Sequence, residues 1–355
     1  MLPGTNTLKE ILSQPEIWEK TIAQVLDCSF DITAFFKESP VSEIILTGCG
    51  SSYYLSLSAA HTLSHVLGIP CRGIPASELI YYPHLFFSRS RLRGGNIIVI
   101  GISRSGSTTE TWMALKRAKG DYNARTMAVT CKASSEIERV ADYYLGLPFS
   151  DEKSVVMTRS FTSMLLALEL MGGILGENSN MVDQLKRLPD LLRSVLKGNT
   201  ELVEYLARNG DITRIIILGN GPAYGVACEA ALKMTEMVLE LSQAYHLLEF
   251  RHGPRAITDP KTAIICIPSD AAEEEEEILL SELKELGAKI ITVGKLWPRA
   301  DFSLGIPVKE LEETVRLPLV MVPLQLLAYK RAMARGLDPD NPRYLTQVVK
   351  LQHAQ

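Results

Sequence analysis

The sequence lacks the features that direct a protein to a membrane, to nucleic acid or into a disulfide-bonded fold. Its 355 residues carry a formal net charge of −4, so they provide no overall positive field for an anionic partner. No apolar run reaches the roughly 18 residues of a membrane-spanning helix. The opening residues lack the basic-then-apolar order of a secretory signal. We therefore expect a cytoplasmic protein with no nucleic-acid or membrane partner.

Metal-binding and disulfide patterns are also scarce. The six cysteines are scattered and form no CxxC pair, which favours reduced thiols over disulfides or zinc. His61 and His65 stand four residues apart and could share one helical face, but no further ligands are evident nearby. We interpret them as ordinary helix histidines and predict neither a metal nor a cofactor.

Short apolar runs alternate with helix-like stretches throughout the chain. They lie at 42–52, 96–106, 126–131 and 143–148, and again at 214–222, 263–270, 289–295 and 302–307. This alternation indicates a parallel sheet covered by helices on both faces. Because the two halves repeat the same order of strands, glycine turns and gaps, we expect duplication of one doubly wound unit.

The predicted fold is α/β, with two tandem flavodoxin-like doubly wound domains. We expect N-terminal helices over 1–35 (with a break near Pro15), the first domain over 36–165, a helical bridge over 166–200, the second domain over 201–335, and a C-terminal tail or lid over 336–355. The acidic run from Glu273 to Glu277 is interpreted as a solvated first turn of a helix rather than a functional site.

The first apolar run ends in a turn of glycines and hydroxyl side chains. Gly48 and Gly50 permit a tight turn, and Ser51 and Ser52 can donate hydrogen bonds to an oxyanion at the start of a helix. The segment lacks the third glycine of a dinucleotide-binding motif and the lysine of a P-loop. Taken alone, it is more typical of an ordinary strand–helix turn.

The second apolar run ends in a segment with far more hydroxyl groups. Residues 102–111 contain six Ser or Thr side chains, together with the positive charge of Arg104. Helix capping accounts for one or two of these hydroxyls. A phosphate monoester, with three acceptor oxygens, suits the whole set.

The sequences CGSSY and SRSGSTTET resemble the two phosphate-binding motifs of the SIS (sugar isomerase) family. The resemblance extends to 9–15, 76–79 and 155–162. It implies that the substrate is a 6-phosphosugar and that its contacts are Gly50, Ser51, Ser52, Ser103, Arg104, Ser105, Thr108 and Val155. The corresponding turn of the second half, in 218–233, has few hydroxyls, and we interpret that half as a scaffold that contributes catalytic residues.

Three residues of the second half are candidate catalytic residues. Lys233 and Glu236 stand three apart on a predicted helix, and His252 precedes a Gly-Pro turn. Taken singly they are typical of a surface ion pair and a loop histidine. Together they resemble the isomerase domain of glucosamine-6-phosphate synthase. In that family the glutamate moves a proton between C1 and C2 of the open sugar. The histidine opens the ring from the neighbouring subunit. The resemblance thus implies catalytic roles for all three residues and a homodimer with shared active sites.

The C-terminal segment resembles the family's closing loop, with one departure. The synthase has a lysine there that forms a Schiff base with the ketose. This chain has Gln347, which we expect to contact and position the substrate but which cannot form an imine. Lys350 follows three residues later. The synthase also has a glutaminase domain that is lacking here, so we expect no ammonia from glutamine by that route.

The favoured function is deamination of an amino-sugar 6-phosphate, such as glucosamine 6-phosphate, coupled to aldose–ketose isomerisation. Ammonia is then a product, and in a synthase-like reaction it would be the nitrogen donor. The alternatives are a simple phosphosugar isomerase, a fructosamine-6-phosphate deglycase, and a non-catalytic phosphosugar sensor. A basic DNA-reading segment is absent while Glu236 and His252 are present, which counts against the sensor.

Overall fold

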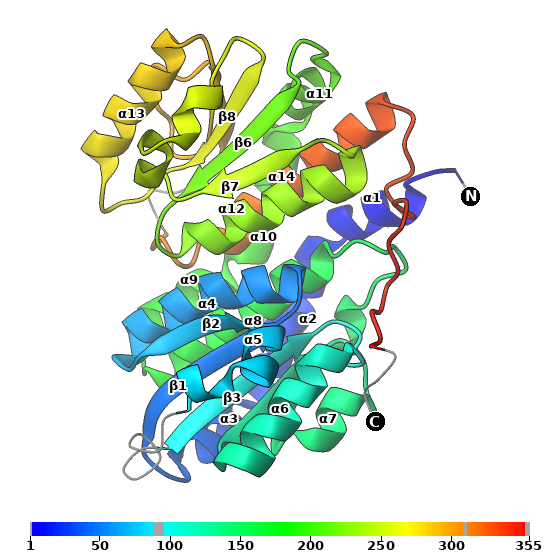
Figure 1. Cartoon of the computed structure of the whole chain (residues 1–355), viewed down its shortest axis with the longest axis vertical. Coiled ribbons are helices and arrows are strands. Elements are labelled where there is room, and N and C mark those ends of the chain that lie inside the picture. The colour runs from blue at the N-terminus through cyan, green and yellow to red at the C-terminus, as the bar shows by residue number, and fades with distance from the viewer. Residues whose placement is uncertain (1, 88–95, 308–310, 352–355) are drawn as a thin grey trace. The chain divides into compact units, whose positions relative to one another are not determined.

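A computed structural model describes residues 2–87, 96–307 and 311–351, and the chain divides into two compact units (Figure 1). The β1–β5 unit consists of Glu16–Glu152, Arg159–Lys186 and Thr346–Gln355. The β6–β10 unit consists of Met1–Pro15, Lys153–Thr158 and Arg187–Leu345. Each unit therefore combines segments that are far apart in the sequence.

The first unit contains a parallel sheet of five strands in the order β2-β1-β3-β4-β5. The strands are β1 (Val41–Gly48), β2 (Cys71–Pro75), β3 (Asn96–Ser103), β4 (Arg125–Thr130) and β5 (Tyr143–Gly146). The Ile side chains of β1 and the Ile and Val side chains of β3 are buried, as expected for a sheet covered on both faces.

Helices cover both faces of this sheet. One face packs against α5 (Ala76–Tyr81), α6 (Thr109–Tyr122) and α7 (Glu136–Val140), in a core that includes Ile45 and Val99. The remaining helices of the unit are α2 (Gln14–Asp27), α3 (Ser29–Lys37), α4 (Ser51–Leu67), α8 (Arg159–Leu175) and α9 (Ser179–Lys186). Among them, α4 packs on β1, β2 and α8. This packing holds the start of α4 against the carboxyl end of β1.

The second unit repeats this plan with a parallel sheet in the order β10-β9-β8-β6-β7. Its strands are β6 (Arg214–Gly219), β7 (Ser242–Tyr245), β8 (Thr262–Ile267), β9 (Lys289–Gly294) and β10 (Phe302–Gly305). Its helices are α1 (Thr5–Leu12), α10 (Leu188–Gly198), α11 (Thr200–Arg208), α12 (Ala223–Lys233), α13 (Glu273–Glu285) and α14 (Leu317–Ala334). Read in chain order, both sheets have the 2-1-3-4-5 arrangement of flavodoxin-like folds.

The predicted α/β class and the repeated sheet are confirmed, and all eight predicted strands are present. The prediction of four strands in each half was wrong, because β2 and β7 were missed. Both are edge strands with one neighbour, and their sequences, CRGIP and SQAY, contain no apolar run. Residues 166–200, which the sequence predicts to be helical, lie largely in α8 to α11.

The start of the C-terminal segment is held to α1 within the β6–β10 unit. The Asp340 carboxylate accepts hydrogen bonds from the backbone N–H groups of Asn6 and Thr7 at 3.0 and 2.7 Å. The Thr7 hydroxyl also donates to this carboxylate, at 2.7 Å. These are donors of the first turn of a helix, which would otherwise lack partners.

All six cysteines are free thiols, and only Cys131 and Cys266 are fully enclosed. In the described ranges, no helix is both long and apolar enough to cross a membrane.

Candidate functional site

The first candidate site lies at the carboxyl ends of β1 and β3. These neighbouring parallel strands connect in opposite directions across the sheet, β1 to β2 and β3 to β4, which makes their ends the switch point where doubly wound folds bind ligands. A Cβ atom on Gly48 would lie 2.9 Å from the carbonyl oxygen of Ile102, so only glycine allows the two strand ends to approach this closely.

The turn after β1 leads directly into α4. Gly50 has a φ of 55° and precedes the helix, while Ser51 and Ser52 form its first turn and are buried. Backbone N–H groups at such a position attract anions. The predicted residues of the first motif are therefore together at one helix N-terminus.

Three hydroxyl groups of the second motif converge after β3. The Ser103 Oγ atom lies 3.5 Å from Ser105 Oγ and 3.3 Å from Thr108 Oγ1. Ser107 is engaged elsewhere, because its hydroxyl donates to the Glu136 carboxylate and thereby lowers the pKa of Glu136. The structure thus brings Ser103, Ser105 and Thr108 into a group of the size that a phosphate requires.

The loop that carries these hydroxyls depends on Gly106. Its φ is 64°, and its N–H donates to Ser103 Oγ at 3.1 Å. A Cβ atom at this position would overlap the Ser135 side chain. A side chain at residue 106 is therefore excluded by both the backbone conformation and the available space.

Arg104 is nearly buried and is paired within the protein. Its guanidinium lies 3.6 Å from the Glu152 carboxylate, and its Nη2 donates to the backbone carbonyl of Gln347 at 3.3 Å. The Gln347 amide in turn contacts the carbonyl of Glu152 at 3.5 Å. Glu152 was missed from the sequence because it comes from a distant loop and has no local spacing signal.

The C-terminal residues of this unit lie beside the second motif. The N–H of Leu351 donates to the Thr109 hydroxyl at 3.2 Å. Lys350 is exposed, and its charge contributes to the lowered pKa of Glu136. Within the β1–β5 unit, Gln347 and Lys350 are thus both close to residues of the second motif.

The second candidate site is in the β6–β10 unit, where α12 ends. The helix widens into a π-helix over Met234–Val238, and Leu239 then adopts a left-handed conformation with a φ of 58°. Local π-helices are frequent at functional sites. Glu236 lies on this turn and is partly exposed.

Lys233 is completely buried beneath Glu236. Its ammonium group lies 2.6 Å from the Glu236 carboxylate and 3.1 Å from the fully buried Glu229 carboxylate. Burial lowers the pKa of Lys233, but the two carboxylates outweigh this effect, and the pKa is raised above its ordinary value. The lysine therefore stays charged and fixes one oxygen of Glu236. Glu229 was missed, although its position four residues before Lys233 on one helix could have indicated it.

His252 and Val155 are in the same unit as Glu236. His252 is exposed and follows the 3-10 turn Leu248–Arg251. Its N–H donates to the carbonyl of Glu249 at 3.0 Å. Gly253 follows with a φ of 124°, so the predicted turn is present. Val155 donates its N–H to the carbonyl of Asp340 at 3.0 Å.

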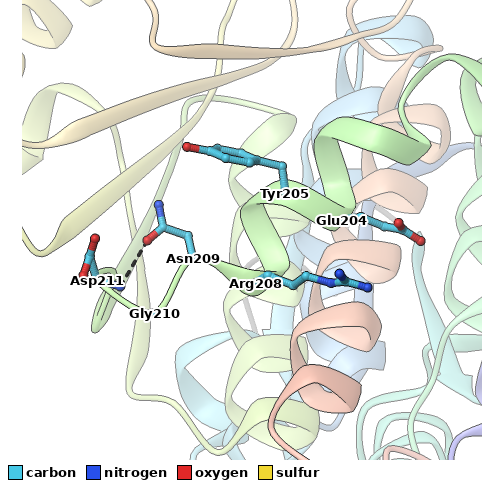
Figure 2. A pocket seen from close by; sticks show the side chains of 6 residues that line it. All are labelled: Glu204, Tyr205, Arg208, Asn209, Gly210 and Asp211. Carbon is cyan, nitrogen blue, oxygen red and sulfur yellow. Dashed lines mark hydrogen bonds between the residues drawn. The ribbon is translucent and has the colours of Figure 1, made fainter.

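Surface hollows in the described ranges also occur away from these motifs. One of about 520 Å³ is lined by Glu204, Tyr205, Arg208, Asn209, Gly210 and Asp211. Figure 2 shows that these residues come from α11 and the loop after it, where the Asp211 N–H donates to Asn209 Oδ1 at 3.1 Å. The loop leads into the amino end of β6, the edge opposite to the usual ligand site. We therefore place no chemistry there.

Metal ligands do not cluster in the part of the chain that the structure describes: no group of three or more His, Cys, Asp or Glu side chains could hold an ion. His61 and His65 are both exposed on α4.

Comparison with known proteins supports the predicted resemblance. Residues 39–172 match the family model described as "SIS domain". The chain is 30% identical to glutamine–fructose-6-phosphate aminotransferase [isomerizing] of Pseudomonas aeruginosa, over 97% of this chain and 58% of the relative. The chain thus spans a little under three fifths of the length of that protein.

Two solved structures resemble the whole chain. Glucosamine-6-phosphate deaminase of Thermotoga maritima is 28% identical, with a TM-score of 0.79, over 98% of this chain and 100% of that chain. The C-terminal domain of glucosamine-fructose-6-phosphate aminotransferase of Francisella tularensis is 25% identical, with a TM-score of 0.82, over 95% and 98% of the two chains. The resemblance inferred from the motifs is therefore confirmed.

Replacing Gly106 with Ala should disrupt the arrangement of the three converging hydroxyls in the second motif. Because the added methyl overlaps Ser135 and the φ is positive, the loop must move. We expect the dissociation constant for a 6-phosphosugar, measured by calorimetry, to rise by at least about tenfold, the equivalent of one lost charge-assisted hydrogen bond. The control is Gly120→Ala in α6, where nothing lies within 4 Å of the added Cβ. Equal affinities of the two variants would contradict this role of the loop.

Proposed function

We propose that this SIS-domain protein deaminates an amino-sugar 6-phosphate, such as glucosamine 6-phosphate, and converts the sugar from aldose to ketose. The observation that carries the proposal is the Lys233–Glu236 pair, in which a buried ammonium group holds a partly exposed carboxylate at 2.6 Å. An ionised carboxylate fixed at one oxygen leaves the other able to accept a proton from carbon.

The proposed reaction needs only proton transfers and water. Glu236 takes the proton from C2 of the open aldehyde while the aldehyde oxygen takes up a proton from water, which gives an enolamine with a C1 hydroxyl. The proton held by Glu236 is then returned to C1, which leaves an iminium group at C2. Water adds to that carbon, ammonia leaves and one proton returns to water, so that a ketose phosphate remains. His252 would exchange the proton between the ring oxygen and the C1 hydroxyl when the ring opens.

The phosphate would be bound by the first unit. The Ser103 hydroxyl lies within 3.5 Å of the hydroxyls of Ser105 and Thr108, and the N-terminus of α4, with Ser51 and Ser52, lies at the same sheet edge. Neutral donors and backbone N–H groups suit a phosphate dianion. Arg104 would act chiefly through Glu152 and the backbone of residue 347, which are its partners here.

Gln347 favours deamination over the transfer reaction. Its amide lies beside the phosphate-binding motif but cannot form an imine with a ketose. The enolamine route needs no such imine. The structural similarity to the deaminase of Thermotoga maritima extends over the whole length of that protein. This similarity also supports deamination rather than transfer.

Incubation with a panel of 6-phosphosugars tests the proposal directly. We expect glucosamine 6-phosphate or a close relative to yield ammonia and ketose phosphate in equal amounts. Glu236→Gln should lower the rate by about 10²–10⁴, because it removes the proton acceptor. The control is Glu274→Gln, the same chemical change at an exposed position of α13. Ketose phosphate without ammonia would indicate an isomerase instead, and tight binding without any product would indicate a sensor.

Borohydride reduction during turnover distinguishes the enolamine route from a lysine-dependent route. With no imine between enzyme and sugar, we expect mass spectrometry to detect no sugar adduct and Gln347→Ala to lower activity only modestly. A sugar adduct on Lys350 that disappears in Lys350→Arg would refute the lysine-free route and favour a synthase-like reaction with ammonia as the donor.

Mixing two inactive variants tests whether the sites are shared between subunits. If His252 serves the partner's site in a homodimer, Glu236→Gln mixed with His252→Ala should recover about a quarter of wild-type activity. Half of the dimers are then hybrids, and each hybrid has one intact site of two. As a control, Glu236→Gln mixed with the double variant that carries both Glu236→Gln and His252→Ala should stay inactive. A fully active monomer in light scattering would rule out shared sites.

A further inference from the structure

The two sheets have switch points at equivalent positions, but the side chains that the neighbouring loops present there are different. In the first sheet the switch point lies between β1 and β3, and in the second between β6 and β8. The loop after β3 presents the converging hydroxyls of Ser103, Ser105 and Thr108. The corresponding loop after β8 presents Ser269, and the loop after β6 presents Asn220.

The donors of the second switch point converge on a carboxylate of the protein itself. Glu276 comes from the first turn of α13, and only 2% of its surface is exposed. It accepts hydrogen bonds from the Ser269 N–H at 2.9 Å, from the Ser269 hydroxyl at 2.8 Å, and from the Asn220 amide at 3.0 Å. The Asn220 side chain is oriented by its own oxygen, which accepts the N–H of Leu247 at 2.9 Å.

This arrangement corrects the interpretation of the acidic run. Glu273, Glu274, Glu275 and Glu277 are exposed, as a solvated first turn requires, but Glu276 is buried. Burial raises its pKa, and the hydrogen bonds from Ser269 and Asn220 oppose that rise. A carboxylate is buried here only because three donors from two strand ends already point to one place.

We infer that the three donors of Ser269 and Asn220 form a second oxyanion-binding site, here called the cradle, at the β6/β8 switch point, and that the Glu276 carboxylate occupies it. Once the Glu276 side chain is removed, the cradle takes up a small oxyanion such as inorganic phosphate. The carboxylate occupies the position that a ligand oxyanion takes in an open switch point, with the same kinds of donors around it. In the native chain, the Glu276 carboxylate therefore keeps this second switch point closed to phosphate. This inference does not depend on the reaction proposed above.

The experiment measures phosphate binding to Glu276→Ala in a background of Ser103→Ala and Ser105→Ala, which weakens the first site. We expect equilibrium dialysis to detect one phosphate per chain that the background protein lacks. Phosphate should also raise the thermal unfolding midpoint of this variant by at least about 2 °C over chloride at equal ionic strength. Formate, which reproduces the missing carboxylate, should do the same.

The matched control is Glu276→Gln, whose amide fills the same volume and should leave the cradle closed to phosphate. A folded Glu276→Ala protein with no additional phosphate, or equal uptake by Glu276→Gln, would overturn the inference. If Glu276→Ala folds only in the presence of phosphate or formate, the inference is supported. If it fails to fold even with these anions, Glu276 is a structural anchor alone and the inference is wrong.

Discussion

Adjacent parallel strands whose connections run in opposite directions determine where this molecule can bind an anion. In both sheets the first and third strands are neighbours, and the loops after them diverge to opposite faces, so backbone N–H groups and short side chains gather at one edge. The close approach of Gly48 to Ile102 depends on the same pairing. The hydroxyl groups of the first unit and the Glu276 carboxylate of the second occupy equivalent places because both sheets have a switch point between their first and third strands.

Buried charges in both units are fixed by partners inside the protein. Lys233 is compensated by Glu229 and Glu236, and Arg104 by Glu152. A buried charge without a partner is costly, so each such pair constrains the residues that carry it. The consequence for Glu236 is chemical as well as structural: the charged lysine beneath it holds one oxygen of a carboxylate that is itself partly exposed.

The sequence was sufficient for the strands that contain an apolar run and for the hydroxyl-rich motif, because both depend on local composition. It was insufficient where structure depends on distant residues. The edge strands β2 and β7 are defined by pairing with one neighbour, since their own residues form no apolar run. The pairing of Arg104 with Glu152 joins different loops. Burial of Glu276 could not be predicted either, because its four acidic neighbours are exposed and only the fold brings Ser269 and Asn220 to its carboxylate.

The contact between Arg104 and residue 347 has a consequence for the chemistry of the C-terminal segment. The guanidinium donates to the backbone carbonyl of Gln347, an acceptor that every amino acid supplies. The position of this segment beside the hydroxyl-rich loop after β3 therefore does not require a particular side chain at residue 347. A lysine at this position could keep the same backbone contact, so the side chain there affects the available chemistry more than the position of the segment. The glutamine amide can form hydrogen bonds but no imine.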